Sequence, residues 1–401
     1  MENNTQLKEM IRSMVIDILQ GQKQEMASSQ PVKQAPRGQV EPGVFDTVDD
    51  AIQAAKAAQA RFEDCTLATR EKVIADIRAT MRPRVQELAQ KTVEETGMGR
   101  VADKVLKLNL TLDKTPGVED LVTECETGDN GMTLYELSAY GVIGAITPST
   151  NPAETLICNT IGMLAAGNAV FFSVHPGAKH LSRLLVSELN QIIAKSIGIE
   201  NLIVTLREPS IESAQEMMLH TDVSLLVVTG GPGVVKQALQ SGKKVIGAGA
   251  GNPPAFVDET ADIKKAAQDI VLGASLDNNI LCIAEKSVVA MRQIEPQLVQ
   301  EMVKAGCALI DNQQDIQRLV DLTVLPNGTP NKKFVGKNAS VILDAAHIPY
   351  NGDPRLIIMR TPKDHPFAVI EMLMPILPVV TVDSFDEGLD VCLMLEAGLY
   401  H

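Results

Sequence analysis

The stretch Val142-Ile143-Gly144-Ala145-Ile146-Thr147-Pro148-Ser149-Thr150-Asn151-Pro152 decides the fold class. Its first six residues form a short, mostly apolar run that is typical of a strand, and a polar loop follows. Residues 154–166 then have the pattern of a helix, which Gly167 is well suited to end. A strand that leads through a short polar loop into a helix is the repeating unit of an α/β sheet.

The same alternation continues outward from this stretch. Further strands are predicted at residues 134–137, 169–173, 202–205, 225–228 and 244–247, and helices at 178–195, 211–220 and 234–240. This order predicts a doubly wound, mostly parallel sheet within residues 43–254, with ligands bound at the carboxyl ends of its strands. A second α/β unit is expected from residue 255 to 401, with a helix at 261–275 and a strand at 287–290. Residues 371–382, which Pro375 and Pro378 interrupt, are expected to form a buried strand with turns.

The N-terminal part of the chain has a different texture. Residues 5–20 carry one apolar stripe at helical spacing, and residues 21–42 form a polar linker with almost no apolar content. A lone amphipathic helix of this length is marginal in water, so the helix at 1–20 needs a partner surface. Docking to another protein and folding back onto its own chain both remain open. Helices are also predicted at residues 49–61, 69–96 and 101–114.

Composition and charge exclude several classes of function. The 401-residue chain has a net charge of −14, which argues against binding to nucleic acid or to an anionic membrane. Its six cysteines lack CxxC spacing, as expected of a reduced, cytoplasmic protein, and its six histidines do not cluster with them, so no metal site is predicted. No apolar run approaches the roughly 18 residues that a membrane span requires.

Cys282 is the candidate nucleophile. It lies on a polar connection between the predicted helix at 261–275 and the predicted strand at 287–290, where a thiol can meet a ligand. A reactive thiol needs partial exposure and nearby donors or positive charge. The alternative is an ordinary half-buried cysteine that serves packing.

Three loops between strands and helices could hold a nucleotide. The first is Thr147-Pro148-Ser149-Thr150-Asn151-Pro152, the second is Thr229-Gly230-Gly231-Pro232-Gly233, and the third spans residues 247–254 with Gly249. Small residues at such turns let a phosphate approach backbone N–H groups. Asn151 could donate a hydrogen bond to a developing oxyanion, or its side chain could simply cap the following helix. Together the loops predict a nucleotide site that faces the thiol.

Several motifs in order resemble those of the aldehyde dehydrogenase superfamily, in its CoA-acylating branch. The resemblance covers nearly the whole chain and is strongest to the propionaldehyde dehydrogenases of bacterial microcompartments, with the acetaldehyde enzymes of ethanolamine utilisation close behind. The motifs are Glu95-Thr96-Gly97-Met98-Gly99, Thr115-Pro116-Gly117-Val118-Glu119, Pro148-Ser149-Thr150-Asn151-Pro152, Val228-Thr229-Gly230-Gly231, residues 247–254, Cys282-Ile283-Ala284-Glu285-Lys286 and Glu371-Met372-Leu373-Met374-Pro375.

The resemblance implies a mechanism. Cys282 would attack a short aldehyde, the oxyanion would be held by the Cys282 backbone N–H and by Asn151 or Thr150, NAD would take the hydride, and coenzyme A would accept the acyl group. His401 would assist the coenzyme A thiol as a base. Cofactor-binding roles would fall to Thr147, Pro148, His175, Thr229, Gly230, Gly231, Gly249 and Glu371. For Glu371 a structural role, capping a loop as a buried carboxylate, stays open.

Departures from the superfamily pattern refine this expectation. The hydrolytic members carry a glutamate that activates water, and this chain has Gly249-Ala250-Gly251-Asn252 in that region, which favours a thiol acceptor. Val174-His175-Pro176 replaces the lysine that often contacts the adenosine ribose, which favours NAD over NADP. A hydrolytic enzyme and a non-catalytic cargo subunit are the rival interpretations.

The resemblance also bears on assembly. Residues 1–20 are similar to encapsulation peptides, so a microcompartment shell or cargo protein is the expected partner and the interior of a bacterial microcompartment the expected location. A hairpin near residues 128–141 would support a homo-oligomer. The family pattern continues past His401, so a C-terminal part of the catalytic domain is expected to be missing.

Overall fold

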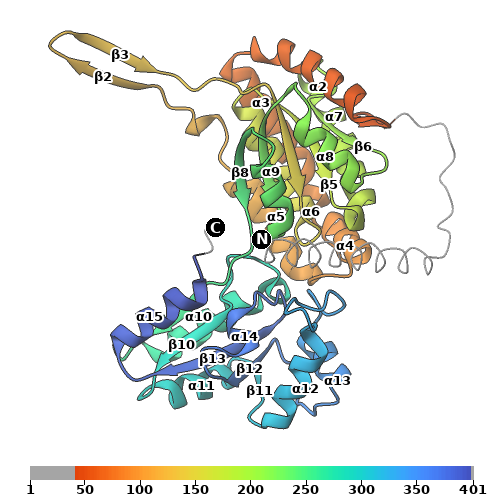
Figure 1. The fold of residues 1–401 in the computed structure, drawn as a ribbon. Helices are drawn as coiled ribbons and strands as arrows, with labels where there is room; N and C mark the ends of the chain where they lie inside the picture. The colour runs from red at the N-terminus through yellow and green to blue at the C-terminus, as the bar shows by residue number, and fades with distance from the viewer. Residues whose placement is uncertain (1–40, 399–401) are drawn as a thin grey trace, which may run out of the picture. The chain divides into compact units, whose positions relative to one another are not determined.

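The computed structural model describes residues 41–398. The predicted helix at 1–20, nearly all of the linker at 21–42, and His401 therefore lie outside the described residues. Figure 1 shows the described chain, which is built around two parallel sheets and a separate hairpin. The α/β fold class predicted from the alternation of strands and helices is confirmed.

The larger sheet has six strands in the order β1-β6-β5-β4-β7-β8, and every neighbouring pair is parallel. Its strands are β1 (Val44–Phe45), β4 (Val142–Thr147), β5 (Ala169–Val174), β6 (Ile203–Leu206), β7 (Val223–Thr229) and β8 (Lys244–Ala248). Strands β4, β5 and β6 are buried along their whole length, which explains their nearly continuous apolar sequences. The chain runs outward from β4 to β6 and then crosses back to β7, so the sheet is doubly wound.

Helices cover this sheet and form one large apolar core with it. They are α2 (Val48–Glu63), α3 (Leu67–Met81), α4 (Val85–Thr96), α5 (Val101–Lys114), α6 (Pro152–Ala165), α7 (Lys179–Ile197), α8 (Ile211–Leu219) and α9 (Pro232–Leu239), with short 3-10 turns η1 (Arg82–Arg84), η2 (Val118–Asp120) and η3 (Pro176–Ala178). The continuous helix predicted at 69–96 is wrong. Pro83 lies in η1 between α3 and α4, because a proline cannot donate the helical hydrogen bond.

The second sheet has five parallel strands in the order β11-β12-β13-β10-β9. Its strands are β9 (Pro254–Val257), β10 (Ser287–Met291), β11 (Cys307–Leu309), β12 (Leu356–Arg360) and β13 (Ile376–Val382). Its helices are α10 (Ile263–Ser275), η4 (Leu276–Asn279), α11 (Glu295–Lys304), α12 (Gln313–Thr323), α13 (Ala339–Ala345), α14 (Pro366–Val369) and α15 (Phe385–Glu396). Since β8 ends at Ala248 and β9 begins at Pro254, the chain passes from one sheet to the other over residues 249–253.

The two-stranded hairpin differs from the prediction. It consists of β2 (Glu124–Gly128) and β3 (Gly131–Tyr135), whereas a single strand was predicted at 134–137 and a hairpin near 128–141. All ten residues of its strands are exposed, so no buried face imposes the apolar alternation that identifies a strand in a sequence. Figure 1 shows the hairpin projecting away from the helices around the larger sheet. Within residues 41–398, no helix combines the length and apolar character needed to cross a membrane.

Candidate active site

The three predicted cofactor loops and the segment that carries His175 leave the larger sheet at one edge. The strand register pairs Thr147 with Val174 and Thr229 with Ala248, and β4 and β7 are direct neighbours. The residues that follow these strand ends are Pro148, His175, Gly230 and Gly249. The order of strand addition reverses between β4 and β7, and this switch point is where doubly wound sheets bind ligands. The structure thus brings the predicted loops together at the edge that suits a nucleotide.

The polar groups at this edge are not all used in contacts within the fold. The Thr147 hydroxyl is buried and makes no hydrogen bond within the described part of the chain. His175 accepts a hydrogen bond at Nδ1 from the Gly177 N–H at 3.0 Å. Burial, helped by the charge of Lys332, lowers the pKa of His175, so its ring is neutral at neutral pH. The Gly230 N–H donates to the Ala248 carbonyl at 3.1 Å, which joins the second loop to the third.

Asn151 precedes α6 without capping it. Its backbone is at the N-cap position, but its side chain makes no capping hydrogen bond. Instead its Oδ1 accepts a hydrogen bond from the ammonium of Lys107, and its Nδ2 donates to Thr150 Oγ1 at 3.2 Å. Of the two roles considered for this side chain, helix capping is therefore not the one found, and its amide group is held in a defined orientation.

Cys282 is half-buried on the connection between η4 and β10, as predicted. The chain reaches it through three consecutive residues in the left-handed conformation, Asp277 (φ 51°), Asn278 (φ 58°) and Asn279 (φ 62°). Asp and Asn tolerate this region better than other side chains, but three in succession are costly and need strong support. All three residues are buried.

Asp277 anchors the start of this turn. Its carboxylate accepts hydrogen bonds from Lys104 at 2.8 Å and from Lys107 at 2.6 Å, and its Oδ1 accepts one from the Arg100 N–H at 2.9 Å. A Cβ on Gly99 would collide with this carboxylate, which explains the second glycine of the Glu95–Gly99 motif. Burial works against the charge, but Lys107 and Lys104 outweigh it and lower the pKa of Asp277.

Polar side chains fix the rest of the turn. Asn278 Nδ2 donates to the Gly336 carbonyl at 2.8 Å, and Asn279 Nδ2 donates to the Ala274 carbonyl at 2.6 Å. The ammonium of Lys286 donates to the carbonyl oxygens of Asn279 at 2.9 Å and Leu281 at 2.6 Å, and to Asn279 Oδ1 at 2.6 Å. All three ammonium protons of Lys286 are therefore spent on the segment that carries Cys282.

The charges around the thiol oppose one another. Burial raises the pKa of Cys282, and the nearby Glu371 raises it further, while Lys286 acts in the opposite direction. Burial also lowers the pKa of Lys286 to about 8 and raises the pKa of Glu371. Without substrate the sulfur is accordingly a neutral thiol at pH 7, beside a buried lysine and a half-buried glutamate.

The motif around Glu371 is tied to two other motifs. Leu373 has a positive φ of 53°, and its carbonyl accepts a hydrogen bond from the Gly336 N–H at 3.0 Å. Gly336 in turn accepts from the Gly99 N–H at 2.8 Å. These links connect the 95–99 and 371–375 segments through one glycine.

Sequence reasoning missed the buried ions beneath the site. Lys104, Lys107, Asp277 and Lys286 are each at most 6% exposed. Lys104 and Lys107 fall within the predicted helix at 101–114, and nothing in their spacing distinguishes them from solvated residues. The available signal was the Asp-Asn-Asn sequence just before Cys282, because these residues favour left-handed turns that need anchoring.

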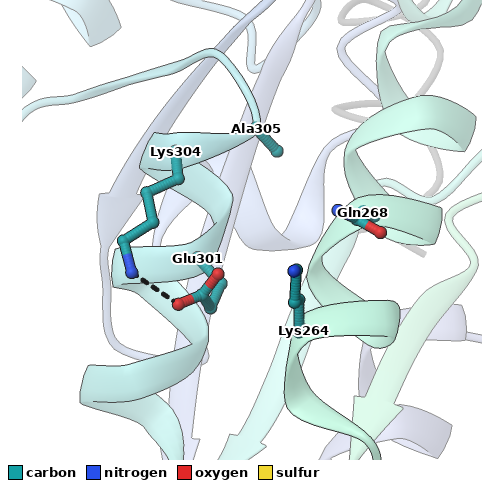
Figure 2. A pocket seen from close by; sticks show the side chains of 5 residues that line it. All are labelled: Lys264, Gln268, Glu301, Lys304 and Ala305. Carbon is teal, nitrogen blue, oxygen red and sulfur yellow. Dashed lines mark hydrogen bonds and ion pairs between the residues drawn. The ribbon is translucent and has the colours of Figure 1, made fainter.

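A surface hollow elsewhere contains none of the predicted site residues. Figure 2 shows this space of about 320 Å³ between α10 and α11. It is lined by Lys264, Gln268, Glu301, Lys304 and Ala305, and Lys304 forms an ion pair with Glu301 at 2.7 Å. The strand edge of the larger sheet remains the better candidate, because polar groups converge there. Within residues 41–398, no three His, Cys, Asp or Glu side chains gather as a metal site would require.

Comparisons with known proteins identify the class. The family model of the aldehyde dehydrogenases matches residues 18–400, so the chain belongs to the aldehyde dehydrogenase family. Among curated proteins, it is 47% identical over 400 residues to a CoA-propanoylating propanal dehydrogenase of Salmonella typhimurium, covering 100% of this chain and 84% of that protein.

Two solved structures are similar in fold and sequence. The first is Rhodopseudomonas palustris propionaldehyde dehydrogenase with bound CoA and an acylated cysteine, with a TM-score of 0.87 and 47% identity over 90% of this chain and 82% of that one. The second is a propionaldehyde dehydrogenase from the fucose utilisation microcompartment of Clostridium phytofermentans, with a TM-score of 0.87 and 47% identity over 89% and 82%.

Proposed function

We propose that this chain is a CoA-acylating aldehyde dehydrogenase that converts a short aldehyde, preferably propionaldehyde, to its acyl-CoA with NAD as oxidant. The observation that carries the proposal is the half-buried Cys282 on a turn anchored at every residue from Asp277 to Asn279. A nucleophile held in this way is pre-organised, which is what catalysis of an addition step requires.

In the proposed reaction the Cys282 thiol loses its proton to solvent, its Sγ bonds to the aldehyde carbon, and the electron pair of the carbonyl π bond moves to the oxygen, which becomes an oxyanion. The Cys282 N–H and Asn151 Nδ2 stabilise this charge, while Thr150 Oγ1 helps to hold the amide. NAD, when bound, supplies the hydride acceptor. The remaining thioester on Cys282 is then attacked by the thiol of coenzyme A, which leaves with the acyl group.

Acyl transfer to a thiol is favoured over hydrolysis by the residues at 249–252. None of them carries a carboxylate, so none can activate water as a base. Asn252 is 1% exposed, and its Nδ2 donates to the carbonyl oxygens of Ala368 at 2.8 Å and Leu395 at 2.7 Å. Both N–H donors of the Asn252 side chain are thus used in hydrogen bonds within the fold.

The loops at the carboxyl ends of the strands in the larger sheet support the binding of a dinucleotide. We assign Thr147, Pro148, His175, Thr229, Gly230, Gly231 and Gly249 to its contacts, with Glu371 at the nicotinamide end. Neither Gly231 nor Gly249 has a positive φ or a neighbour that a Cβ would meet, so the fold itself does not require glycine there. Close approach of a ligand explains both. A neutral His175, instead of a lysine, favours NAD over NADP.

The direct test is to measure NADH formation from propionaldehyde and NAD with and without coenzyme A. The proposal predicts sustained turnover only with coenzyme A, and one acyl-CoA formed for each NADH. Sustained turnover that ignores coenzyme A, with free acid as product, would reject acylation. Replacing propionaldehyde by acetaldehyde removes one methylene, so we expect kcat/KM to fall by about 10- to 200-fold if the pocket fits the longer chain.

The N-terminal segment suggests where the enzyme acts. We place it inside a bacterial microcompartment, with the apolar stripe of residues 1–20 docking onto a shell or cargo protein. Deleting residues 1–20 should leave activity in solution unchanged and abolish co-sedimentation with shells. Equal co-sedimentation of the shortened protein would refute this role.

The hairpin suggests a homo-oligomer. Within residues 41–398 the outer edges of β2 and β3 pair with no other strand, and Met132, Leu134 and Tyr135 are each at least 50% exposed. An apolar, unpaired edge of this kind favours pairing with a second chain. Leu134→Lys should therefore lower the molar mass measured by light scattering. An unchanged mass would remove the hairpin from the interface.

A further inference from the structure

A cluster of buried charges joins Asn151, the predicted oxyanion donor, to Asp277, where the turn that leads to Cys282 begins. Lys104 and Lys107, both on α5, donate to the same Asp277 oxygen, and their side chains are 0% and 7% exposed. Glu154 of α6 forms an ion pair with Lys107 at 3.3 Å and is also buried. Two cations thus face two carboxylates, and the cluster is balanced in charge.

Besides its contacts with Asp277 and Glu154, Lys107 has a third contact that Lys104 lacks. Its ammonium also donates to Oδ1 of Asn151. An ammonium has three donors and no acceptor, so it can hold only the oxygen side of an amide. The Nδ2 group must then point the other way, toward Thr150 Oγ1, and the orientation of the amide follows from chemistry.

We propose that Lys107 is a positioning residue for acylation: one buried ammonium fixes the Asn151 amide with its N–H groups toward the substrate and ties that amide to Asp277, where the turn to Cys282 begins. This inference rests on the proposed function. Lys107 does not touch the reacting atoms in this account. It acts by keeping the oxyanion donor in register with the nucleophile.

Loss of Lys107 should slow the reaction because the Asn151 amide could then flip. Without Lys107 the Asn151 side chain is free to rotate and present Oδ1 to the oxyanion, which removes a donor and adds repulsion. Loss of one oxyanion donor lowers kcat by about 10²- to 10³-fold. Because the wrong orientation competes with the right one, we expect a loss of about 10- to 100-fold in kcat from loss of the anchor.

Lys104 is a matched control. It lies one turn away on the same helix, is equally buried, and donates to the same Asp277 oxygen. Its other hydrogen bond goes to the backbone carbonyl of Thr150 at 2.9 Å and leaves the Asn151 amide untouched. Replacing either lysine removes the same charge from the cluster, and only the change at 107 frees the amide.

Two balanced variants avoid leaving an unpaired buried charge. Lys107→Met with Glu154→Gln, and Lys104→Met with Glu154→Gln, each remove one cation and one carboxylate. Steady-state kinetics with propionaldehyde, NAD and coenzyme A should show kcat reduced about 10- to 100-fold in the first and less than about fivefold in the second. KM values should change by less than about threefold in both, because ground-state binding does not use the oxyanion donor.

A double-mutant comparison shows whether the effect passes through Asn151. If Lys107 acts by orienting the amide, the Lys107→Met/Glu154→Gln pair should cost nothing further in an Asn151→Ala background. Alkylation of Cys282 by iodoacetamide forms no oxyanion, so its rate should stay within about twofold in both balanced variants.

The results of these experiments distinguish a failure of the role of Lys107 from a failure of the proposed function. Equal losses from the Lys104 and Lys107 variants, or additive losses with Asn151→Ala, overturn the role of Lys107 and leave the proposed function intact. An Asn151→Ala enzyme with unchanged kcat overturns the oxyanion assignment itself. Should the balanced 107 variant fail to fold, Lys107→Arg keeps a donor on Asn151 and must retain kcat within about tenfold, and a larger loss in that folded protein contradicts the proposal.

Discussion

The strand-end loops of the larger sheet and the turn from Asp277 to Cys282 are held in place in different ways. The loops after β4, β7 and β8 take their positions from strand register, and Gly231 and Gly249 have space around them. The turn takes its shape from side-chain hydrogen bonds to three left-handed residues. The strand-end loops are therefore placed by backbone pairing alone, whereas the turn that carries Cys282 depends on a shell of polar side chains.

The largest expected effect tests the nucleophile. Cys282→Ala should lower kcat by about 10³-fold or more, because no other group on the turn can form the thioester. Cys158→Ala, at an exposed thiol on α6, is the control and should keep full activity. Turnover that survives in the Cys282 variant would show that the anchored turn serves the fold and not the chemistry.

The next effect tests the anchor of that turn. Asp277→Asn leaves Lys104 and Lys107 with too little negative charge in a buried site, and it should reduce the free energy of unfolding by about 3–5 kcal/mol. Denaturant titration followed by circular dichroism measures this change. Asp383→Asn removes an exposed ion pair with Arg292 and should leave stability nearly unchanged. Equal stabilities of the two variants would mean that the buried cluster does not hold the turn.

A smaller effect concerns the charges beside the thiol. Lys286 favours the thiolate, so Lys286→Met should raise the pKa of Cys282, while Glu371→Gln should lower it. Lys286 has a pKa of about 8 and is therefore charged below that pH. The difference in Cys282 reactivity between Lys286→Met and wild type should be present below pH 8 and fade at higher pH, where the wild-type lysine loses its proton. The rate of iodoacetamide alkylation of the Cys282 peptide against pH measures both shifts. Shifts of the same sign in the two variants would contradict this arrangement.

The smallest effect tests the loops. A Cβ at Gly249 meets no atom of the protein within 4 Å, so Gly249→Ala should fold normally. If a dinucleotide approaches this backbone closely, the KM for NAD should rise about tenfold, the lower end of the scale for one extra methylene in a fitted site. Gly128→Ala, at an equally open position in the hairpin, is the control. An unchanged KM would separate Gly249 from the cofactor.

Prediction from sequence succeeded where burial leaves a clear pattern of apolar residues. The strand at Val142–Thr147 was predicted with the bounds that the structure has, because a strand buried on both faces has an uninterrupted apolar sequence. The break at Pro83 was not predicted, and the exposed β2–β3 hairpin was predicted near residues 128–141 but with the wrong bounds, since neither is set by a buried face. Position also predicted that Cys282 lies on a polar connection between a helix and a strand, where the structure shows it half-buried.

The polar shell could not be predicted in the same way. Lys107 is separated from Asn151 by 44 positions and from Asp277 by 170, and only the folded chain brings the three together. A buried lysine and a solvated lysine on a helix look alike in one sequence. The roles of the loop residues and of Glu371 remain predictions for the experiments above.

The most direct measurement is mass spectrometry of the protein after incubation with propionaldehyde and NAD in the absence of coenzyme A. We predict a propionyl group on the peptide that contains Cys282, and its disappearance on addition of coenzyme A as propionyl-CoA forms in equal amount. A propionyl group on another residue, or NADH formation with no acylated Cys282, would contradict the account.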